Sequence, residues 1–129
     1  MDLRGSAILI VEDDPAQREL FQELLRTEGY AVEAAPDRTR GLARIEAGGV
    51  DLVLLDLVLP DGNGLDLCRQ IRVRARERHL PIIILSVAGA GHTPHDCLAA
   101  GADDFIEKPF DLMDLLDRIR VQLERFPPW

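Results

Sequence analysis

The chain has 129 residues, a length typical of one domain, and its hydrophobic fraction of 47% is sufficient for a continuous core. The formal net charge of -8 argues against a nucleic-acid-binding module, because phosphate backbones select surfaces rich in Lys and Arg. We recognise neither a signal peptide nor an apolar stretch that could cross a bilayer, so we expect a cytoplasmic protein without membrane contact. Cys68 and Cys97 have no metal-finger spacing and are expected to be reduced thiols.

Strand and helix patterns alternate from the beginning of the chain. Residues 7–11 (AILIV) form a continuous aliphatic run, which is typical of a strand buried on both faces of a parallel sheet. Residues 15–28 repeat apolar side chains at helical spacing, and Asp14 is suited to the N-cap of this helix. A weaker strand over residues 31–35 and a helix over residues 38–47 follow.

The same alternation continues through the rest of the chain. In order, we expect a strand at residues 52–55, a helix at 64–74, a strand at 82–85, a helix at 93–100, a strand at 104–107 and a helix at 111–126. Five strand–helix repeats predict an α/β fold with a five-stranded parallel sheet, doubly wound as (βα)5, and right-handed crossovers. We expect residues 1–126 to form the domain and residues 127–129 to be a tail or the start of a linker.

Polar and charged residues stand where the predicted strands end. Glu12 and Asp13 follow the first strand, and Asp56 follows the third. Ser86 follows the fourth strand and Lys108 the fifth. In an open parallel sheet these strand ends meet at one edge, where ligands bind, so the carboxylates would repel one another unless a cation joined them. Oxygen ligands favour a hard ion such as Mg²⁺, and the lysine and the hydroxyl suit the oxygens of a phosphoryl group.

With these residues in place, the sequence resembles the receiver domains of two-component response regulators, from about residue 6 to residue 125. The matching stretches are ILIVEDDP (residues 8–15), DLVLLDLVLPDGNGLDL (51–67), PIIILSV (81–87) and GADDFIEKPF (101–110). The resemblance implies a flavodoxin-like, CheY-like fold of three layers, with the sheet between two layers of helices.

The resemblance also implies a phosphorylation site. Asp56 matches the residue that accepts a phosphoryl group from a phosphohistidine on a sensor histidine kinase or a histidine phosphotransfer protein. The implied Mg²⁺ ligands are Glu12 (through water), Asp13, Asp56 and the backbone carbonyl of Val58. Lys108 matches the phosphate-binding lysine, and its bond to Pro109 is expected to be cis. The domain would thus catalyse its own phosphorylation through Asp56, Lys108 and Ser86, without turnover of a separate substrate.

Ser86 and Phe105 match the switch residues of the family. The resemblance implies that phosphorylation draws Ser86 toward Asp56 and that Phe105 moves into the vacated space. The face made by the fourth helix, the fifth strand and the fifth helix is then rearranged. Some regulators dimerise through this face, and in such a homodimer Asp104 and Arg118 could form crossed ion pairs.

Two further positions concern the lifetime of the phosphorylated state. In the family, the residues two places after the phosphoacceptor and after the switch hydroxyl tune dephosphorylation. These residues are Val58 and Ala88, and neither can position an attacking water. We therefore expect a fairly long-lived phosphoryl group.

Other classes fit the sequence less well. A haloacid-dehalogenase-type phosphatase would need a second Asp where Val58 stands, and a flavodoxin-type module would need a phosphate loop where the acidic residues follow the first strand. The motif GxxxxGK[ST] of a P-loop enzyme is absent. His92, His95 and Cys97 lack a fourth ligand for zinc. The remaining alternative is a pseudo-receiver that acts as a docking or dimerisation module, whose hallmark would be loss of the phosphoacceptor, the lysine or the acidic pair.

Overall fold

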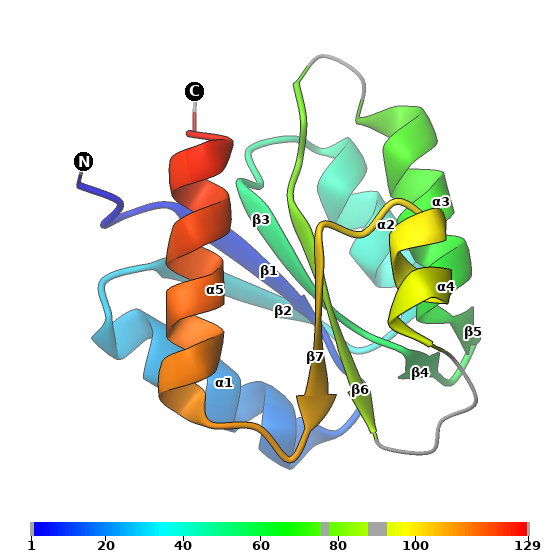
Figure 1. Cartoon of the computed structure of the whole chain (residues 1–129), viewed down its shortest axis with the longest axis horizontal. Coiled ribbons are helices and arrows are strands. Elements are labelled where there is room, and N and C mark those ends of the chain that lie inside the picture. The colour runs from blue at the N-terminus through cyan, green and yellow to red at the C-terminus, as the bar shows by residue number, and fades with distance from the viewer. Residues whose placement is uncertain (1, 76–77, 88–92, 129) are drawn as a thin grey trace.

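The computed structural model describes residues 2–75, 78–87 and 93–128. In this part of the chain, five parallel strands form one sheet with the order β2-β1-β3-β6-β7. The strands are β1 (Ala7–Val11), β2 (Ala31–Ala35), β3 (Leu52–Asp56), β6 (Ile82–Val87) and β7 (Asp104–Lys108). The helices are α1 (Pro15–Thr27), α2 (Arg38–Glu46), α3 (Gly64–Arg74), α4 (Pro94–Ala99) and α5 (Leu112–Arg125). Helices cover both faces of the sheet, which confirms the predicted fold (Figure 1).

The five helices divide unequally between the two faces of the sheet. α1 and α5 lie on one face, and α2, α3 and α4 lie on the other (Figure 1). A separate hydrophobic cluster fills each interface. Phe21 and Leu115 belong to the cluster under α1 and α5, whereas Ile45, Leu67 and Cys97 belong to the opposite one. Alternate residues of each central strand enter opposite clusters, which explains why these strands are apolar without interruption.

Three strands extend one or two residues further than the sequence pattern predicts. Asp56 is the last residue of β3, where it pairs with Leu85 of β6. Ser86 pairs with Glu107 of β7, and Lys108 is the last residue of that strand. Backbone pairing continues past the apolar runs because the ladder of hydrogen bonds does not require apolar side chains. The sheet itself therefore holds three of the residues that we expected just beyond it.

A short antiparallel hairpin, which the sequence pattern does not predict, follows β3. Its strands are β4 (Val58–Leu59) and β5 (Gly62–Asn63), and the turn between them consists of residues 60–61. Strands of two residues are too short to give a recognisable alternation of apolar and polar side chains. The hairpin places a second piece of ordered backbone directly after Asp56 (Figure 1).

Each helix begins at a side chain that accepts a hydrogen bond from its first turn. The N-cap residues are Asp14 of α1, Asp37 of α2, Asn63 of α3, Thr93 of α4 and Asp111 of α5. The cap predicted at Asp14 is confirmed, since its carboxylate accepts from the amide of Ala16 at 3.2 Å. These caps satisfy N–H groups that have no partner inside the helix.

Two expectations from composition concerned the cysteines and the membrane. Cys68 and Cys97 are free and buried. Burial raises the pKa of the Cys68 thiol to about 11, so this thiol is protonated and unreactive near neutral pH. Within the described residues, none of the helices combines the length and the apolar composition that a bilayer crossing requires.

The close approach of α3 to the end of β3 can be tested by the substitution Gly64→Ala, which adds a methyl group. A Cβ atom there would lie 2.4 Å from the carbonyl oxygen of Asp56 and 3.0 Å from the Cα atom of Leu57. Because these are backbone atoms, Gly64→Ala is expected to lower the free energy of unfolding by roughly 2–3 kcal/mol. Gly41→Ala is the control, since the three atoms nearest to its Cβ, outside its own helix, would be side-chain atoms of Val11 and Leu67. Urea denaturation of both variants measures the difference, and equal losses would contradict the steric explanation.

Candidate functional site

Three carboxylates meet at the carboxyl edge of the sheet. Glu12 and Asp13 directly follow β1, and Asp56 ends the neighbouring strand β3. One oxygen of each carboxylate lies within 4.8 Å of an oxygen of the other two. Asp13 is exposed, whereas Glu12 and Asp56 are only 1% and 7% exposed. The sequence prediction that these residues converge is therefore confirmed, and the cluster could hold a metal ion.

The burial of this cluster has an electrostatic cost. The pKa of Glu12 is raised to about 8, chiefly by burial and further by the hydrogen bond and the negative charge of Asp56. The Oε2 atom of Glu12 is buried and has no hydrogen-bond partner among the described residues. A cation would satisfy this oxygen and offset the repulsion, and the oxygen-only donors suit a hard divalent ion. The residues present thus fit a metal site on chemical grounds.

Lys108 brings a positive charge to the same edge. Its Nζ atom lies 3.8 Å from Oε1 of Glu12 and 3.8 Å from Oδ2 of Asp56. Nζ also donates a hydrogen bond of 2.9 Å to Oε1 of Gln17 on α1. The cis peptide bond predicted between Lys108 and Pro109 is confirmed. The amine is therefore near the carboxylates but is held by a neutral side chain.

Gln17 and Arg18, which no sequence motif predicts, also belong to the site. Gln17 is the hydrogen-bond partner of Lys108, and the guanidinium of Arg18 donates to the backbone carbonyls of Glu12 and Asp13 at 3.0 and 2.9 Å. Both residues lie on α1, where Gln and Arg are typical of a solvated helix face. No sequence signal separates them from other polar residues of the helix, so only the packing of α1 against the strand ends reveals their roles.

The remaining predicted site residues occupy three different surroundings. Ser86 is buried at the end of β6, and its hydroxyl donates to the carbonyl of Val87 at 3.3 Å. Phe105 is half-buried in β7 and packs against the cluster beneath α3 and α4. Val58 has an exposed side chain, and its amide donates to Oδ1 of Asp56 at 3.4 Å. Ala88, the other position tied to phosphate lifetime, lies outside the described residues.

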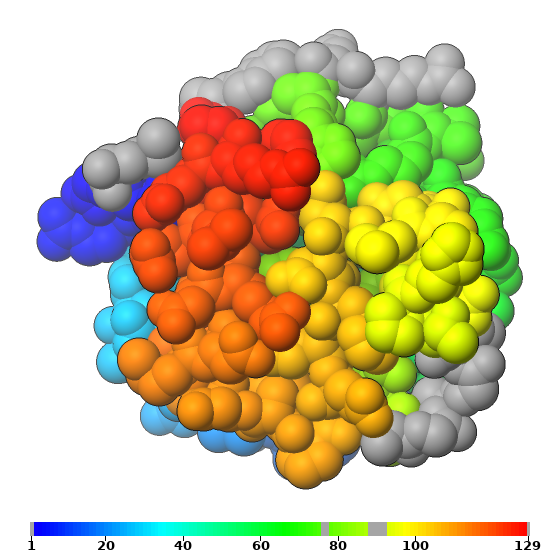
Figure 2. Space-filling model, viewed as in Figure 1, coloured from blue at the N-terminus to red at the C-terminus, as the bar shows by residue number. Residues whose placement is uncertain are grey.

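The face proposed for the switch is formed by α4, β7 and α5. Figure 2 shows this face, with α5 and α4 on either side of β7. Arg118 of α5 forms ion pairs within the chain, with Asp104 at 2.8 Å and with Asp114 at 3.1 Å. The two residues considered for crossed pairs in a homodimer thus already contact each other in the single chain.

The zinc alternative gains no support from the described residues. His95 is exposed and Cys97 is buried, while His92 lies outside the described residues. Within the described part of the chain, the group of possible metal ligands comprises only Glu12, Asp13 and Asp56.

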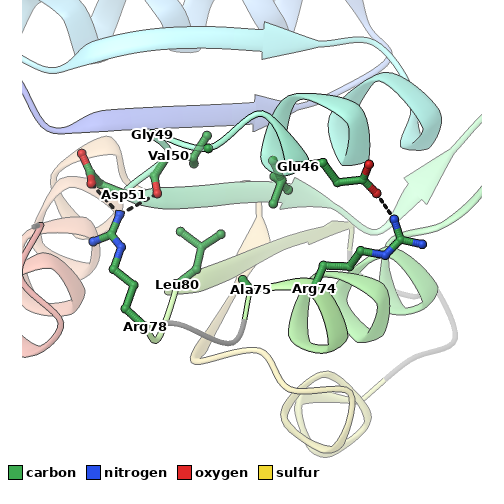
Figure 3. Close-up of a pocket in the computed structure, with 10 residues that line it drawn as sticks. Glu46, Gly49, Val50, Asp51, Arg74, Ala75, Arg78 and Leu80 are labelled. Carbon is green, nitrogen blue, oxygen red and sulfur yellow. Dashed lines mark hydrogen bonds and ion pairs between the residues drawn. The ribbon is translucent and has the colours of Figure 1, made fainter.

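An open pocket of about 780 Å³ lies at the opposite end of the sheet. Asp51 and Leu80, which line it, precede β3 and β6, so the pocket is a strand length away from the carboxylates (Figure 3). Arg78 pairs there with Asp51 at 2.7 Å, and Arg74 pairs with Glu46. This pocket brings together none of the predicted site residues.

Comparison with known proteins identifies the family. Residues 8–120 match the response regulator receiver domain. The transcriptional regulatory protein CseB of Streptomyces coelicolor is 44% identical over 119 residues, which are 92% of this chain and 50% of that protein. Response regulator ArlR of Staphylococcus saprophyticus is 42% identical over 120 residues, which are 93% of this chain and 53% of that protein. The chain thus spans about half the length of these curated relatives.

Solved structures agree with the sequence comparison. A CheY-like receiver domain protein from Methanospirillum hungatei has a TM-score of 0.86 and 35% identity, and the match covers 94% of this chain and 95% of that one. A two-component response regulator from Clostridium difficile has a TM-score of 0.85 and 26% identity over 93% of this chain and 97% of that one. With a matching family over residues 8–120, this fold and this acidic edge, the chain belongs to the response regulator receiver domain family.

Proposed function

We propose that Asp56 is the phosphoacceptor of this receiver domain and that Mg²⁺ is its cofactor. The observation that supports this most directly is the position of Asp56 at the carboxyl edge of the sheet. Its carboxylate is buried at the end of β3, in a cluster with two other carboxylates, and its Oδ2 atom lies 3.8 Å from the amine of Lys108. A nucleophilic carboxylate, ligands for a divalent ion and a lysine are the parts that phosphoryl transfer requires.

The proposed reaction transfers a phosphoryl group from a phosphohistidine to Asp56. One carboxylate oxygen of Asp56 forms the new bond to phosphorus, while the bond from phosphorus to the histidine nitrogen breaks and its electron pair stays with the histidine. Mg²⁺, when held by Glu12 (through water), Asp13, Asp56 and the carbonyl of Val58, would neutralise charge on the phosphoryl oxygens. Lys108 exchanges its hydrogen bond to Gln17 for one to a phosphoryl oxygen.

The proposed readout begins at Ser86. The acyl phosphate on Asp56 offers acceptor oxygens to the Ser86 hydroxyl, which among the described residues donates a long hydrogen bond of 3.3 Å to the carbonyl of Val87. Movement of Ser86 frees space for Phe105, whose ring already packs partly into the core. Both conformations exist before phosphorylation, and the modification shifts their populations on the α4-β7-α5 face.

The proposed partner is a sensor histidine kinase or a histidine phosphotransfer protein. A pseudo-receiver is disfavoured because the phosphoacceptor, the lysine and the acidic pair are all present. CseB is named as a transcriptional regulatory protein, so gene regulation is the output that we propose for a full-length regulator containing this domain. A homodimer through the α4-β7-α5 face stays a prediction, and it would have to compete with the pairs that Arg118 forms within the chain.

Phosphorylation by a small-molecule donor tests the assignment of Asp56. In Mg²⁺ and acetyl phosphate, the wild type is expected to gain one phosphoryl group, and Asp56→Asn is expected to gain none because the amide is not a nucleophile. The control is Asp117→Asn, on the exposed side of α5, which should be phosphorylated like the wild type. Intact-protein mass spectrometry measures the result. A phosphoryl group on Asp56→Asn, or its absence from the wild type, would overturn the assignment.

The stability of the same variant tests the metal site. In EDTA, Asp56→Asn removes one of the mutually repelling carboxylates and is expected to raise the free energy of unfolding by about 1–3 kcal/mol. Addition of Mg²⁺ should stabilise the wild type much more than this variant, because ligand binding stabilises only the form that binds it. Thermal denaturation in EDTA and in Mg²⁺ measures both effects, with Asp117→Asn again as the control. Equal stabilisation of both proteins by Mg²⁺ would contradict the site.

The lifetime of the acyl phosphate tests the role of Val58. Its exposed, apolar side chain cannot hydrogen-bond a water molecule beside Asp56. Val58→Asn introduces such a group and is expected to accelerate loss of the phosphoryl group roughly tenfold. The control is Val73→Asn, an equally exposed valine on α3. Dephosphorylation is followed by mass spectrometry after removal of the donor, and unchanged kinetics in Val58→Asn would refute this role.

A further inference from the structure

The β4–β5 hairpin determines where Val58 lies relative to Asp56. Val58 pairs with Asn63, and Leu59 pairs with Gly62, so the turn of the hairpin consists of Pro60 and Asp61. Because the proposed metal site uses the backbone carbonyl of Val58, any displacement of the hairpin would displace that ligand. The contacts that fix the hairpin are therefore part of how the site is built.

The base of the hairpin is fixed by hydrogen bonds to the sheet and to α3. The amide of Leu57 donates to the carbonyl of Leu85 in β6 at 3.0 Å. The carbonyl of Leu57 accepts from the amide of Gly64, the first residue of α3, at 2.7 Å. These bonds hold the residue before Val58 but leave the other end of the hairpin, at Asp61, to be fixed by something else.

Asp61 fixes this tip to the N-terminus of α2. Its Oδ1 atom accepts from the amide of Arg38 at 2.8 Å. Its Oδ2 atom accepts from the amide of Thr39 at 3.1 Å and from the Thr39 hydroxyl at 2.8 Å. The two amides belong to the first turn of α2, where N–H groups have no partner inside the helix and where negative charge is favoured. The three hydrogen bonds hold the pKa of Asp61 below its usual range.

The side chain of Arg38 reinforces the same contact. A Cβ atom at Gly62 would lie 2.7 Å from Nη1 of Arg38, so the guanidinium lies directly against the hairpin backbone. The same Nη1 atom lies 3.8 Å from Oδ2 of Asp66 in α3. Glycine at position 62 permits this approach, and the tip of the hairpin is held between α2 and the start of α3.

We propose that Asp61 is a positioning residue, which anchors the hairpin tip to α2 and so sets the place of Val58 in the metal site. This inference rests on the proposed function of the site. With Leu57 fixed at one end and Asp61 at the other, Val58 lies between two anchors. Loss of Asp61 removes the three hydrogen bonds that join the hairpin tip to α2, so Val58 is held less firmly. The site must then order Val58 each time it binds an ion, and its affinity falls.

Asp37 provides a control that distinguishes the positioning role of Asp61 from ordinary capping of α2. Asp37 is the N-cap of the same helix, and its carboxylate accepts from the amide of Arg40 at 2.8 Å. Asp37 is not part of the hairpin. Removal of either carboxylate weakens the start of α2, but only removal of Asp61 also breaks the hydrogen bonds between α2 and the hairpin tip. Asp61→Ala and Asp37→Ala are therefore both expected to lower the stability of the domain. Only Asp61→Ala is expected to weaken the metal site.

The experiment measures Mg²⁺ binding by calorimetric titration, at a temperature well below the unfolding of every variant. Both alanine variants are expected to lower the melting temperature by about 3–6 °C. Asp61→Ala should weaken Mg²⁺ binding roughly tenfold, and Asp37→Ala by less than about twofold. Asp61→Asn keeps one acceptor oxygen and should fall between the wild type and Asp61→Ala; it also serves if the alanine variant is too unstable. Hydrogen exchange of residues 58–63 should accelerate in Asp61→Ala only.

Two results would overturn the positioning role while leaving the proposed function intact. The first result is that Asp61→Ala loses stability but binds Mg²⁺ with the same affinity as the wild type. The other is an equal loss of affinity in Asp37→Ala, since the effect would then come from α2 as a whole. Absence of Mg²⁺ binding by the wild type itself would instead refute the proposed metal site, and the positioning role with it.

Discussion

The repulsion among the carboxylates at one edge of the sheet is the constraint around which the rest of the site is arranged. Parallel strands end at the same edge, so the pairing of β1 with β3 brings Glu12, Asp13 and Asp56 together whatever their charges. Burial then raises the pKa of Glu12 and leaves one of its oxygens without a partner. The fold therefore carries an electrostatic cost at this edge, which a divalent ion would offset.

The basic groups around the cluster offset only part of this negative charge. Lys108 is close enough to attract two carboxylates, yet its hydrogen bond goes to the neutral Gln17. The guanidinium of Arg18 donates hydrogen bonds to the backbone carbonyls of Glu12 and Asp13, not to a carboxylate of either residue. The cluster thus keeps a buried carboxylate oxygen of Glu12 without a hydrogen-bond partner among the described residues, which suits the proposed metal site.

Support for the site also comes from elements that contribute no ligand of their own. α2 holds the tip of the β4–β5 hairpin through Asp61, and α3 approaches the end of β3 so closely that only glycine fits at position 64. The site therefore depends on the packing of helices on one face of the sheet. The proposed conformational change involves other residues, Ser86 and Phe105, and reaches α4 and α5.

Sequence patterns predict the fold class, the order of the five long strands and five helices, and the main residues of the candidate site. Continuous aliphatic runs predict strands buried on both sides, and polar residues after these runs must gather at one edge of a parallel sheet, so Asp56, Ser86 and Lys108 could be found without coordinates. Only the tertiary structure revealed Gln17, Arg18 and Asp61, because their roles depend on which helix packs beside which strand end. The β4–β5 hairpin was likewise decided by tertiary contacts, since strands of two residues carry no periodic pattern and are held by their neighbours.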